Sequence, residues 1–399
     1  MNPRTRILSA ALCVAFAATP TAATGPPPPA SAIPDVPTFE RDLERRDGLL
    51  GVLIDRDAGR VYLEIPGVGA DGHSDRYVLA TGLAAGLGSN PIGLDRGQVA
   101  EGGIVTFRRI GRRVLLDQAN PRFAAGAGGA DERTAGAGSC ASSILWSGPV
   151  VAAGPGSRFV IDATTLVVRD AHEVVARLRE VDSPEWSLDP DRSLPELDAC
   201  VAFPDNVELE ATVTFSGKRP GTEVVSVTPR PDSVTLRVHQ SIVRLPDDRF
   251  DARPFDPRSG SFAVAWRDYA APLDEPVDRR FLVRHRLIPI DPSARPRVPV
   301  RPIVYHVDRG IPEPIRTAVL EGASWWSAAF EAAGWQDAFR VALRPEGMDP
   351  LAARYNVVQW VHRSTRGWSY GGGIVDPRTG EGITGHINLG SLRVRQDRL

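Results

Sequence analysis

Between about residues 39 and 266 the sequence consists of short segments in which apolar and polar side chains alternate, with turn residues between the segments. Two pairs flank short turns: LGVLID and RVYLEI around Asp57-Ala58-Gly59, and IVTFRRI and RVLLD around Gly111. Longer examples are VELEATVTF and VTLRVHQSIV. Successive side chains of a strand point to opposite faces, so this alternation indicates strands with two different faces. The region is therefore predicted to be an antiparallel β-rich domain, residues 39–270.

One helix is expected inside this domain, from Thr164 to Glu180, and it contains the sequence HEVVA at residues 172–176. The zinc motif HExxH needs both histidines, because only positions i and i+4 on one helical face can bind the same metal ion while the Glu acts as base. Ala176 stands at the second position. His172 and Glu173 are accordingly expected to lie on a solvated helix surface.

A dense run of prolines marks a connection over residues 271–300. After it the pattern alternates: PIVYHVD, FRVALRP, YNVVQWVH and GHINLGS are predicted strands, and Glu313 to Ala333 is a predicted helix with prolines at its start. Gly334 follows where a left-handed C-cap is needed. The whole chain is thus predicted to be α+β, with an antiparallel β-rich N-terminal domain followed by an α/β segment over residues 301–399.

The N-terminus has the features of a secretory signal. Arg4 and Arg6 precede an apolar run from Ile7 to Ala18, and small residues follow. The run is too short for a bilayer span, which needs about 20 residues. We expect a signal peptide at 1–23, a Pro-rich linker at 24–38, and an exported protein, periplasmic or extracellular, with no membrane span after cleavage.

Two cysteines remain after such cleavage, Cys140 and Cys200. In an oxidising compartment they could form one disulfide, or both could be buried free thiols. The sequence leaves both alternatives open.

The charge balance bears on the partners. The chain has 47 basic and 49 acidic residues, and no dense run of Lys or Arg forms a stripe that could follow a phosphate backbone. Nucleic acid is therefore not an expected partner.

The seven histidines do not form a local metal-ligand pair, since the two nearest in sequence are His285 and His306. We therefore expect no cofactor in this chain and no stoichiometric zinc. A zinc site assembled from distant residues, such as His306, His362 and His386, remains an alternative.

Residues 367–371, GWSYG, match the GxSxG pattern of serine hydrolases. That motif works as a strand, a strained turn and then a helix. Here GGGIVDPRTGEG follows, and three glycines with a proline disfavour a helix. Ser369 as a nucleophile is kept as the weakest functional alternative.

Two long segments near the C-terminus carry a family resemblance: YHVDRGIPEPIRTAVLEGASWWSAAFEAAGWQDAF, and RYNVVQWVHRSTRGWSYGGGIVDPRTGEGITGHINLGSLRVRQD. They resemble the start of the catalytic domain of a family of exported bacterial zinc-dependent metalloproteases. In that family a metzincin-like catalytic domain follows a β-rich domain of unknown function. The resemblance implies hydrolysis of peptide bonds, zinc as cofactor of the full-length protein, and a peptide or protein substrate.

The zinc motif of that family, HExxHxxGxxH, does not occur in these 399 residues. No catalytic residue or metal ligand can be transferred, and this chain is expected to be inactive as given, truncated before the zinc-binding helix. A second hypothesis is a non-enzymatic exported β-rich binding module or pseudoprotease. With no closing helix, the α/β sheet is expected to be covered by a helix on one face only.

The resemblance also implies a substrate-binding strand at Gly382–Gly390, which would border the cleft and pair with an extended peptide. Alternation places Ile383, Ile387 and Leu389 on one face, suited to the core, and His386 and Asn388 on the face toward solvent or a ligand. The candidate substrate-binding residues are Ile383, His386, Asn388 and Gly390.

Overall fold

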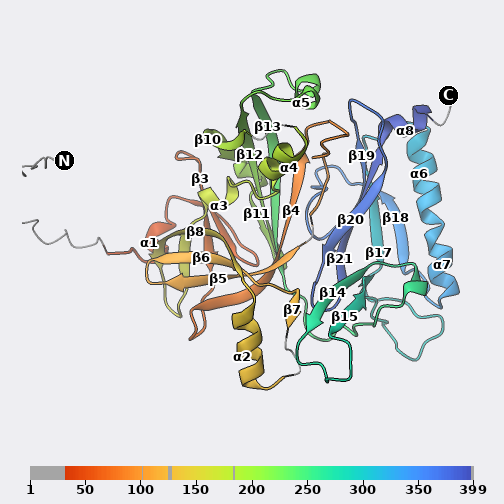
Figure 1. Ribbon diagram of the computed structural model, residues 1–399, viewed down its shortest axis with the longest axis horizontal. Helices are drawn as coiled ribbons and strands as arrows, with labels where there is room; N and C mark the ends of the chain where they lie inside the picture. Colours follow the sequence, from red (N-terminus) through yellow and green to blue (C-terminus); the bar gives the residue numbers. More distant parts are fainter. Residues whose placement is uncertain (1–31, 101, 125–127, 183–184, 397–399) are drawn as a thin grey trace, which may run out of the picture. The chain divides into compact units, whose positions relative to one another are not determined.

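The computed structural model describes residues 32–100, 102–124, 128–182 and 185–396. The expected signal peptide and most of the Pro-rich linker lie outside these residues. From Pro34 onward the chain forms one compact unit. Two extended sheets dominate it, joined by a small third one (Figure 1).

The larger sheet has twelve strands, and every neighbouring pair in it is antiparallel. The hairpins expected around Asp57-Ala58-Gly59 and Gly111 are present, and the two long alternating segments are paired neighbours. The predicted antiparallel β-rich region is therefore confirmed. In spatial order its strands are β1 (Glu44–Arg46), β2 (Gly51–Asp55), β3 (Arg60–Ile65), β9 (Phe159–Asp162), β8 (Ser143–Ala153), β6 (Arg113–Gln118), β5 (Gly103–Ile110), β4 (His73–Ala85), β13 (Ser233–Arg244), β12 (Asn206–Gly217) and β10 (Trp186–Pro195), with β11 (Val201–Phe203) pairing with β12.

The helices of this region are short, and the single helix expected from Thr164 to Glu180 is wrong. It is interrupted: Glu173 has a left-handed φ of 55°, and the Asp170 carboxylate accepts hydrogen bonds from the N–H groups of Val174 and Val175, which start a new helix. The helices are α1 (Val36–Phe39), α2 (Ala130–Ser139), α3 (Thr164–Val167), α4 (Val174–Val181), α5 (Thr222–Val227) and the 3₁₀ turn η1 (Leu197–Ala199).

The Pro-rich stretch of residues 271–300 contains two strands of its own. Within it β15 (Asp278–Leu282) pairs antiparallel with β14 (Ala263–Asp268), which runs parallel to β7 (Phe123–Ala124) in a three-stranded sheet. The 3₁₀ turn η2 (Pro257–Ser259) precedes β14, and β16 (Arg284–His285) joins the next sheet.

The six-stranded sheet contains the predicted C-terminal strands. β17 (Ile303–Val307) lies between β18 (Phe339–Leu343) and β19 (Asn356–Val361), and β19 pairs with β21 (Glu381–Gly390), all parallel. β20 (Tyr370–Val375) pairs antiparallel with β21. Parallel strands after an antiparallel region, with helices in the connection from β17 to β18, confirm the α+β class.

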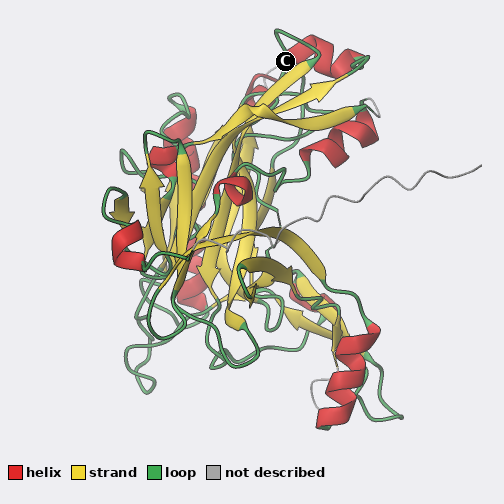
Figure 2. Ribbon diagram, turned by 90° about the vertical axis from the view of Figure 1, so that its left-hand side faces the viewer, coloured by secondary structure: helices red, strands yellow, loops and turns green. Residues whose placement is uncertain are grey.

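The predicted helix from Glu313 to Ala333 is present as α6 (Ile315–Ser324) and α7 (Trp326–Ala332), which divide at Trp325 and lie along the outer side of this sheet (Figure 1). Figure 2 shows that strands form the body of the molecule and that the helices lie around them. Gly334 has a φ of 81°, as expected for its C-cap. The last described element, α8 (Ser391–Gln396), follows β21 directly.

The two faces of the six-stranded sheet have different partners. One carries an apolar cluster of Val307, Val358 and Trp360, and the helix residues Ile315 and Val319 pack against it. The sequence suggested that the other face is uncovered, but the structure shows that it is covered. It packs on the twelve-stranded sheet region, where the Ala353 N–H donates to Glu208 at 2.7 Å, Asn388 donates to the Gly97 carbonyl at 3.3 Å, and Arg363 forms a buried ion pair with Asp95.

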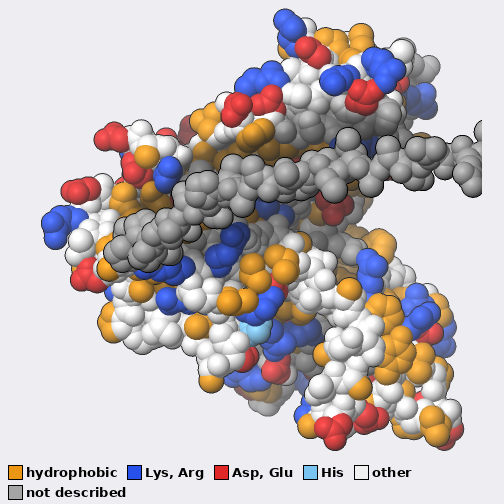
Figure 3. Space-filling model, turned by 60° about the vertical axis from the view of Figure 1, so that its left-hand side comes forward, with side chains coloured by type: hydrophobic (Ala, Val, Ile, Leu, Met, Phe, Trp, Pro, Cys, Tyr) orange, Lys and Arg blue, Asp and Glu red, His pale blue; other side chains and the backbone are white. Residues whose placement is uncertain are grey.

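Cys140 and Cys200 are both free thiols, so they do not form a disulfide. Burial raises the pKa of the Cys200 thiol to about 11. No helix in the described part of the chain is long and apolar enough to cross a membrane. On the face shown in Figure 3, acidic and basic side chains are interspersed rather than gathered by sign.

Candidate buried carboxylate-histidine site

The site begins with the register of β12 and β13. Glu210 lies opposite His239, and Glu208 lies opposite Ser241. Residues two apart on a strand share a face, and directly opposite residues are neighbours, so all four side chains gather on one face of the large sheet. All four are buried.

Both ring nitrogens of His239 face carboxylates. Nε2 lies 2.9 Å from Oε2 of Glu208, and Nδ1 lies 3.3 Å from Oε2 of Glu210. Glu208 Oε2 also accepts a hydrogen bond from the Ser241 hydroxyl, and Glu210 Oε1 forms an ion pair with Arg237. The ring is therefore held in orientation from both sides.

Burial alone would lower the pKa of the His239 imidazole. The hydrogen bonds to Glu208 and Glu210 outweigh burial, and the pKa is raised to about 10. The ring is consequently an imidazolium at neutral pH. It partly balances two carboxylates that would otherwise be buried without sufficient positive charge.

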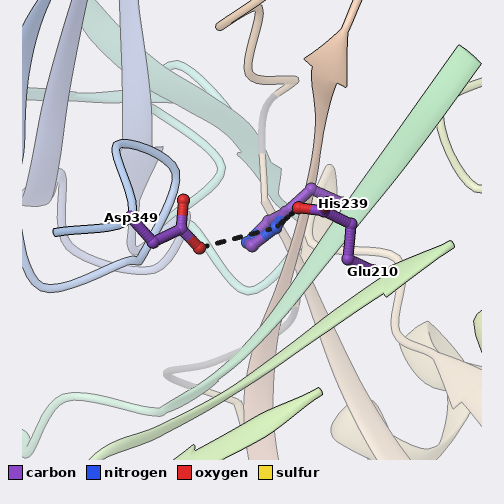
Figure 4. A group of neighbouring side chains, drawn as sticks. All are labelled: Glu210, His239 and Asp349. Carbon is purple, nitrogen blue, oxygen red and sulfur yellow. Dashed lines mark hydrogen bonds and ion pairs between the residues drawn. The ribbon is translucent and has the colours of Figure 1, made fainter. Parts of the chain in front are cut away.

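A third carboxylate comes from the C-terminal part of the fold, which contains the six-stranded sheet. Asp349 lies on the loop that follows β18, and its Oδ2 is 4.0 Å from Nδ1 of His239 (Figure 4). On the same loop, the Ala353 N–H donates to Glu208 Oε1. The loop is thus held against the face of β12 and β13 by a direct hydrogen bond and by charge.

The polar face of β21 lies close to this group. His386 is 3% exposed, neither of its ring nitrogens has a hydrogen-bond partner, and the neighbouring Thr384 hydroxyl and Asn388 Oδ1 are likewise buried without one. Burial, aided by the charge of His239 and opposed by that of Asp349, lowers the pKa of His386 to about 4. His386 is thus a neutral imidazole within electrostatic reach of a charged one.

A cavity of about 780 Å³ opens onto Glu210 and Asp349. That volume is typical of sites for small molecules and cofactors. Both parts of the fold contribute to its wall. The large sheet region supplies Ala84, Arg96, Asp198, Ala199, Val201, Phe203, Glu210 and Arg237, and the C-terminal part supplies His306, Pro345, Glu346, Gly347, Met348, Asp349, Pro350, Leu351, Ala352, Arg354, Tyr355 and Gln359.

β21 is an internal strand of the six-stranded sheet. It pairs with β20 over residues 382–388, with β19 from His386 to Gly390 and with β16 at Glu381 and Gly382, so few of its backbone groups are free to pair with an extended peptide. The segment taken for a border of the cleft is internal because the glycine-rich stretch after Ser369 forms β20. The N–H of Gly390 donates to the Ser369 hydroxyl at 3.3 Å.

The prediction for the faces of β21 is confirmed for Ile387 and Leu389 only. Ile387 and Leu389 pack against the cluster under α6, whereas His386 and Asn388 lie buried rather than toward solvent. Ile383 differs: it packs with Val78 and Ala80 of the large sheet. Ile374 pairs with Thr384 and Val375 with Gly382, so Ile383 is the extra residue of a β-bulge, which breaks the alternation. A role of Ile383, His386, Asn388 and Gly390 in substrate binding stays a prediction.

The other sequence motifs are now placed. Ser369 is followed by the strand β20, so the helix that a nucleophile elbow requires is missing there. His172 is not on a solvated helix surface; its Nδ1 is 3.1 Å from the Thr81 hydroxyl. His306 lines the cavity, but His362 lies 2.9 Å from the Ser391 hydroxyl, and within the described ranges the group that could hold a metal ion is Glu210, His239 and Asp349.

The buried position of His172 gives a first prediction. Burial lowers its pKa to about 4, below an unfolded value of about 6.5, so its contribution to stability is present above pH 6.5 and is lost as the pH falls through 4. His172→Gln removes this titration. Between pH 7 and pH 4 the unfolding free energy of the variant should fall by about 2 to 3 kcal/mol less than that of the wild type. Urea denaturation across this range measures it, and parallel pH profiles would contradict the burial argument.

The fold and the site therefore define an α+β protein with a buried carboxylate-histidine group beside a cavity. Residues 97–290 match the family model described as a domain of unknown function (DUF5117). The match begins shortly before β5 and ends shortly after β16. It includes Glu208, Glu210 and His239, while Asp349 and His386 lie beyond it. No curated protein and no solved structure matches the chain.

Proposed function

We propose that this chain is the peptide-binding part of an exported peptidase, and that the peptide binds in the cavity between the twelve-stranded and six-stranded sheets. The observation that carries the proposal is that both parts of the fold contribute residues to one cavity of about 780 Å³. The resemblance of residues 300–398 to exported zinc-dependent metalloproteases supplies the class of ligand.

The wall of the cavity suits a peptide chemically. Asp349 offers negative charge, and Arg96 and Arg354 offer positive charge. Apolar side chains such as Met348 lie between them. Peptides carry both charges and apolar side chains, and a few placed polar groups in an apolar wall give orientation and specificity.

Binding without hydrolysis is proposed for these 399 residues. The sequence contains no HExxH motif, and Ser369 is followed by a strand instead of the helix that would support an oxyanion.

The experiment uses Arg354, which is exposed, lines the cavity and lies 3.6 Å over the Phe203 ring. Pools of N-acetylated octapeptides are equilibrated with the purified chain, retained peptides are identified by mass spectrometry, and their Kd is measured by calorimetry. Arg354→Ala should weaken the best acidic peptide about tenfold, which corresponds to about 1.4 kcal/mol. Arg249→Ala, an exposed arginine paired with Asp247, serves as control and should bind like the wild type. Failure of the wild type to retain any peptide would refute the proposal.

A further inference from the structure

We propose that Glu210, His239 and Asp349 form a binding site for one divalent transition-metal ion, separate from any zinc motif of a peptidase. The three residues come from β12, β13 and the loop after β18. Each can offer one ligand atom, and these atoms lie within 4.8 Å of one another. The inference does not depend on peptide binding.

The distances are close to those that a metal requires. Zinc binds imidazole nitrogen and carboxylate oxygen at about 2.0 to 2.2 Å, so two ligands of a tetrahedral ion lie about 3.4 Å apart. Nδ1 of His239 is 3.3 Å from Oε2 of Glu210 and 4.0 Å from Oδ2 of Asp349. Only Asp349 has to move appreciably, and its side chain is 38% exposed on a loop.

The support around His239 has the form found at metal sites. A metal-binding histidine usually donates its second ring N–H to a carboxylate, which fixes the ring and its tautomer. Glu208 Oε2 occupies that position at 2.9 Å from Nε2. Glu208 is in turn held by the Ala353 N–H and the Ser241 hydroxyl.

The net negative charge of this group of side chains favours binding of a cation. Glu208, Glu210 and Asp349 supply three carboxylates, and Arg237 supplies one guanidinium. Binding of a metal ion at Nδ1 displaces the proton of the His239 imidazolium, which leaves two net negative charges for a divalent ion to neutralise. Burying carboxylates without that compensation is costly.

An independent observation is the state of His386. Its side chain is buried, neither ring nitrogen has a hydrogen-bond partner, and the charges of His239 and Asp349 both act on it. Buried polar atoms are nearly always paired, so two unpartnered ring nitrogens within electrostatic reach of this group are consistent with a polar ligand binding there.

The donor set selects the class of ion. One imidazole with two carboxylates suits zinc or manganese. Calcium takes six to eight oxygen ligands and magnesium retains several waters, so neither is matched by this set. Zn²⁺ is the probe, and Ca²⁺ is the contrast.

The full chain, without an affinity tag, is dialysed against chelator and titrated with ZnCl₂ or CaCl₂ by calorimetry. We expect one Zn²⁺ per chain and no heat from Ca²⁺. Asp349→Asn should weaken Zn²⁺ binding at least tenfold. Glu346→Gln, an exposed carboxylate on the same loop and the same cavity wall, is the matched control and should bind like the wild type.

A second measurement locates the ion. Zinc-soaked crystals should show an anomalous peak between Glu210, His239 and Asp349, and this readout holds even where Asp349→Asn lowers stability. The proposal is overturned by absence of zinc binding in the wild type, by equal affinity in folded Asp349→Asn, or by a peak at other histidines.

Discussion

Asp95→Asn should lower the free energy of unfolding by about 3 to 5 kcal/mol, because it leaves a buried arginine without its counter-charge. Asp95 accepts two hydrogen bonds from Arg363, at 2.8 and 2.7 Å, and one from the Tyr370 hydroxyl at 2.9 Å. Both side chains of the ion pair are about 95% buried. The pair joins the segment before β5 to the loop after β19, so its loss loosens the contact between the two large sheets.

Urea denaturation measures this effect. Asp205→Asn is the matched control: it breaks an aspartate-arginine pair with Arg244, but one whose side chains are more than half exposed. Exposed pairs contribute about 0 to 1 kcal/mol, so the control should stay near the wild type. Equal, small losses in both variants would show that the Asp95-Arg363 pair does not hold the sheets together.

Glu208→Gln should cost about 3 kcal/mol by the same measurement. Glu208 is fully buried and accepts hydrogen bonds from the Ala353 N–H and Ser241, besides facing the His239 ring. The amide has the shape of the carboxylate but no charge, and one of its ends donates where an acceptor is required. The His239 imidazolium then loses its nearest counter-charge.

Glu180→Gln provides the control, since Glu180 forms an exposed pair with Arg177 on α4. Its expected loss is below about 0.5 kcal/mol. If Glu208→Gln were as mild as this control, the buried group would not contribute to stability in the way described.

The local pattern of the chain predicted its elements well. Alternation identified β12 and β13, and the combination of Pro312, Pro314 and Gly334 bounded the helical segment of α6 and α7. These features depend on neighbours in sequence. The break at Glu173 was missed because Asp170 caps the new helix through its side chain, which a periodicity of apolar residues does not show.

The site could be predicted only in part. Glu208 and Glu210 alternate with Val207 and Leu209, which indicates a polar face but not what covers it. A polar face is normally expected toward water, and here the C-terminal sheet covers it. Asp349 reaches His239 from a loop 110 residues further along the chain (239 to 349), and no local signal connects them.

The sequence pattern also could not predict that β21 pairs with strands on both of its sides. This pairing depends on β20, whose three consecutive glycines do not indicate a strand, because glycine usually weakens one. Gly373 shows why glycine is needed there: a Cβ at this position would lie 2.1 Å from the Thr384 carbonyl oxygen. The close approach of two backbones is a tertiary constraint that the sequence pattern does not reveal.

The central claim is that the two parts of the fold bind a peptide in one shared cavity. Hydrogen-deuterium exchange of the full chain, with and without the best retained octapeptide, tests it most directly. We predict slower exchange in two separate segments, residues 345–355 and the part of β11 and β12 around Val201–Glu210. Protection confined to one of these segments, or found only at β20 and β21, would contradict a cavity built jointly by the two sheets.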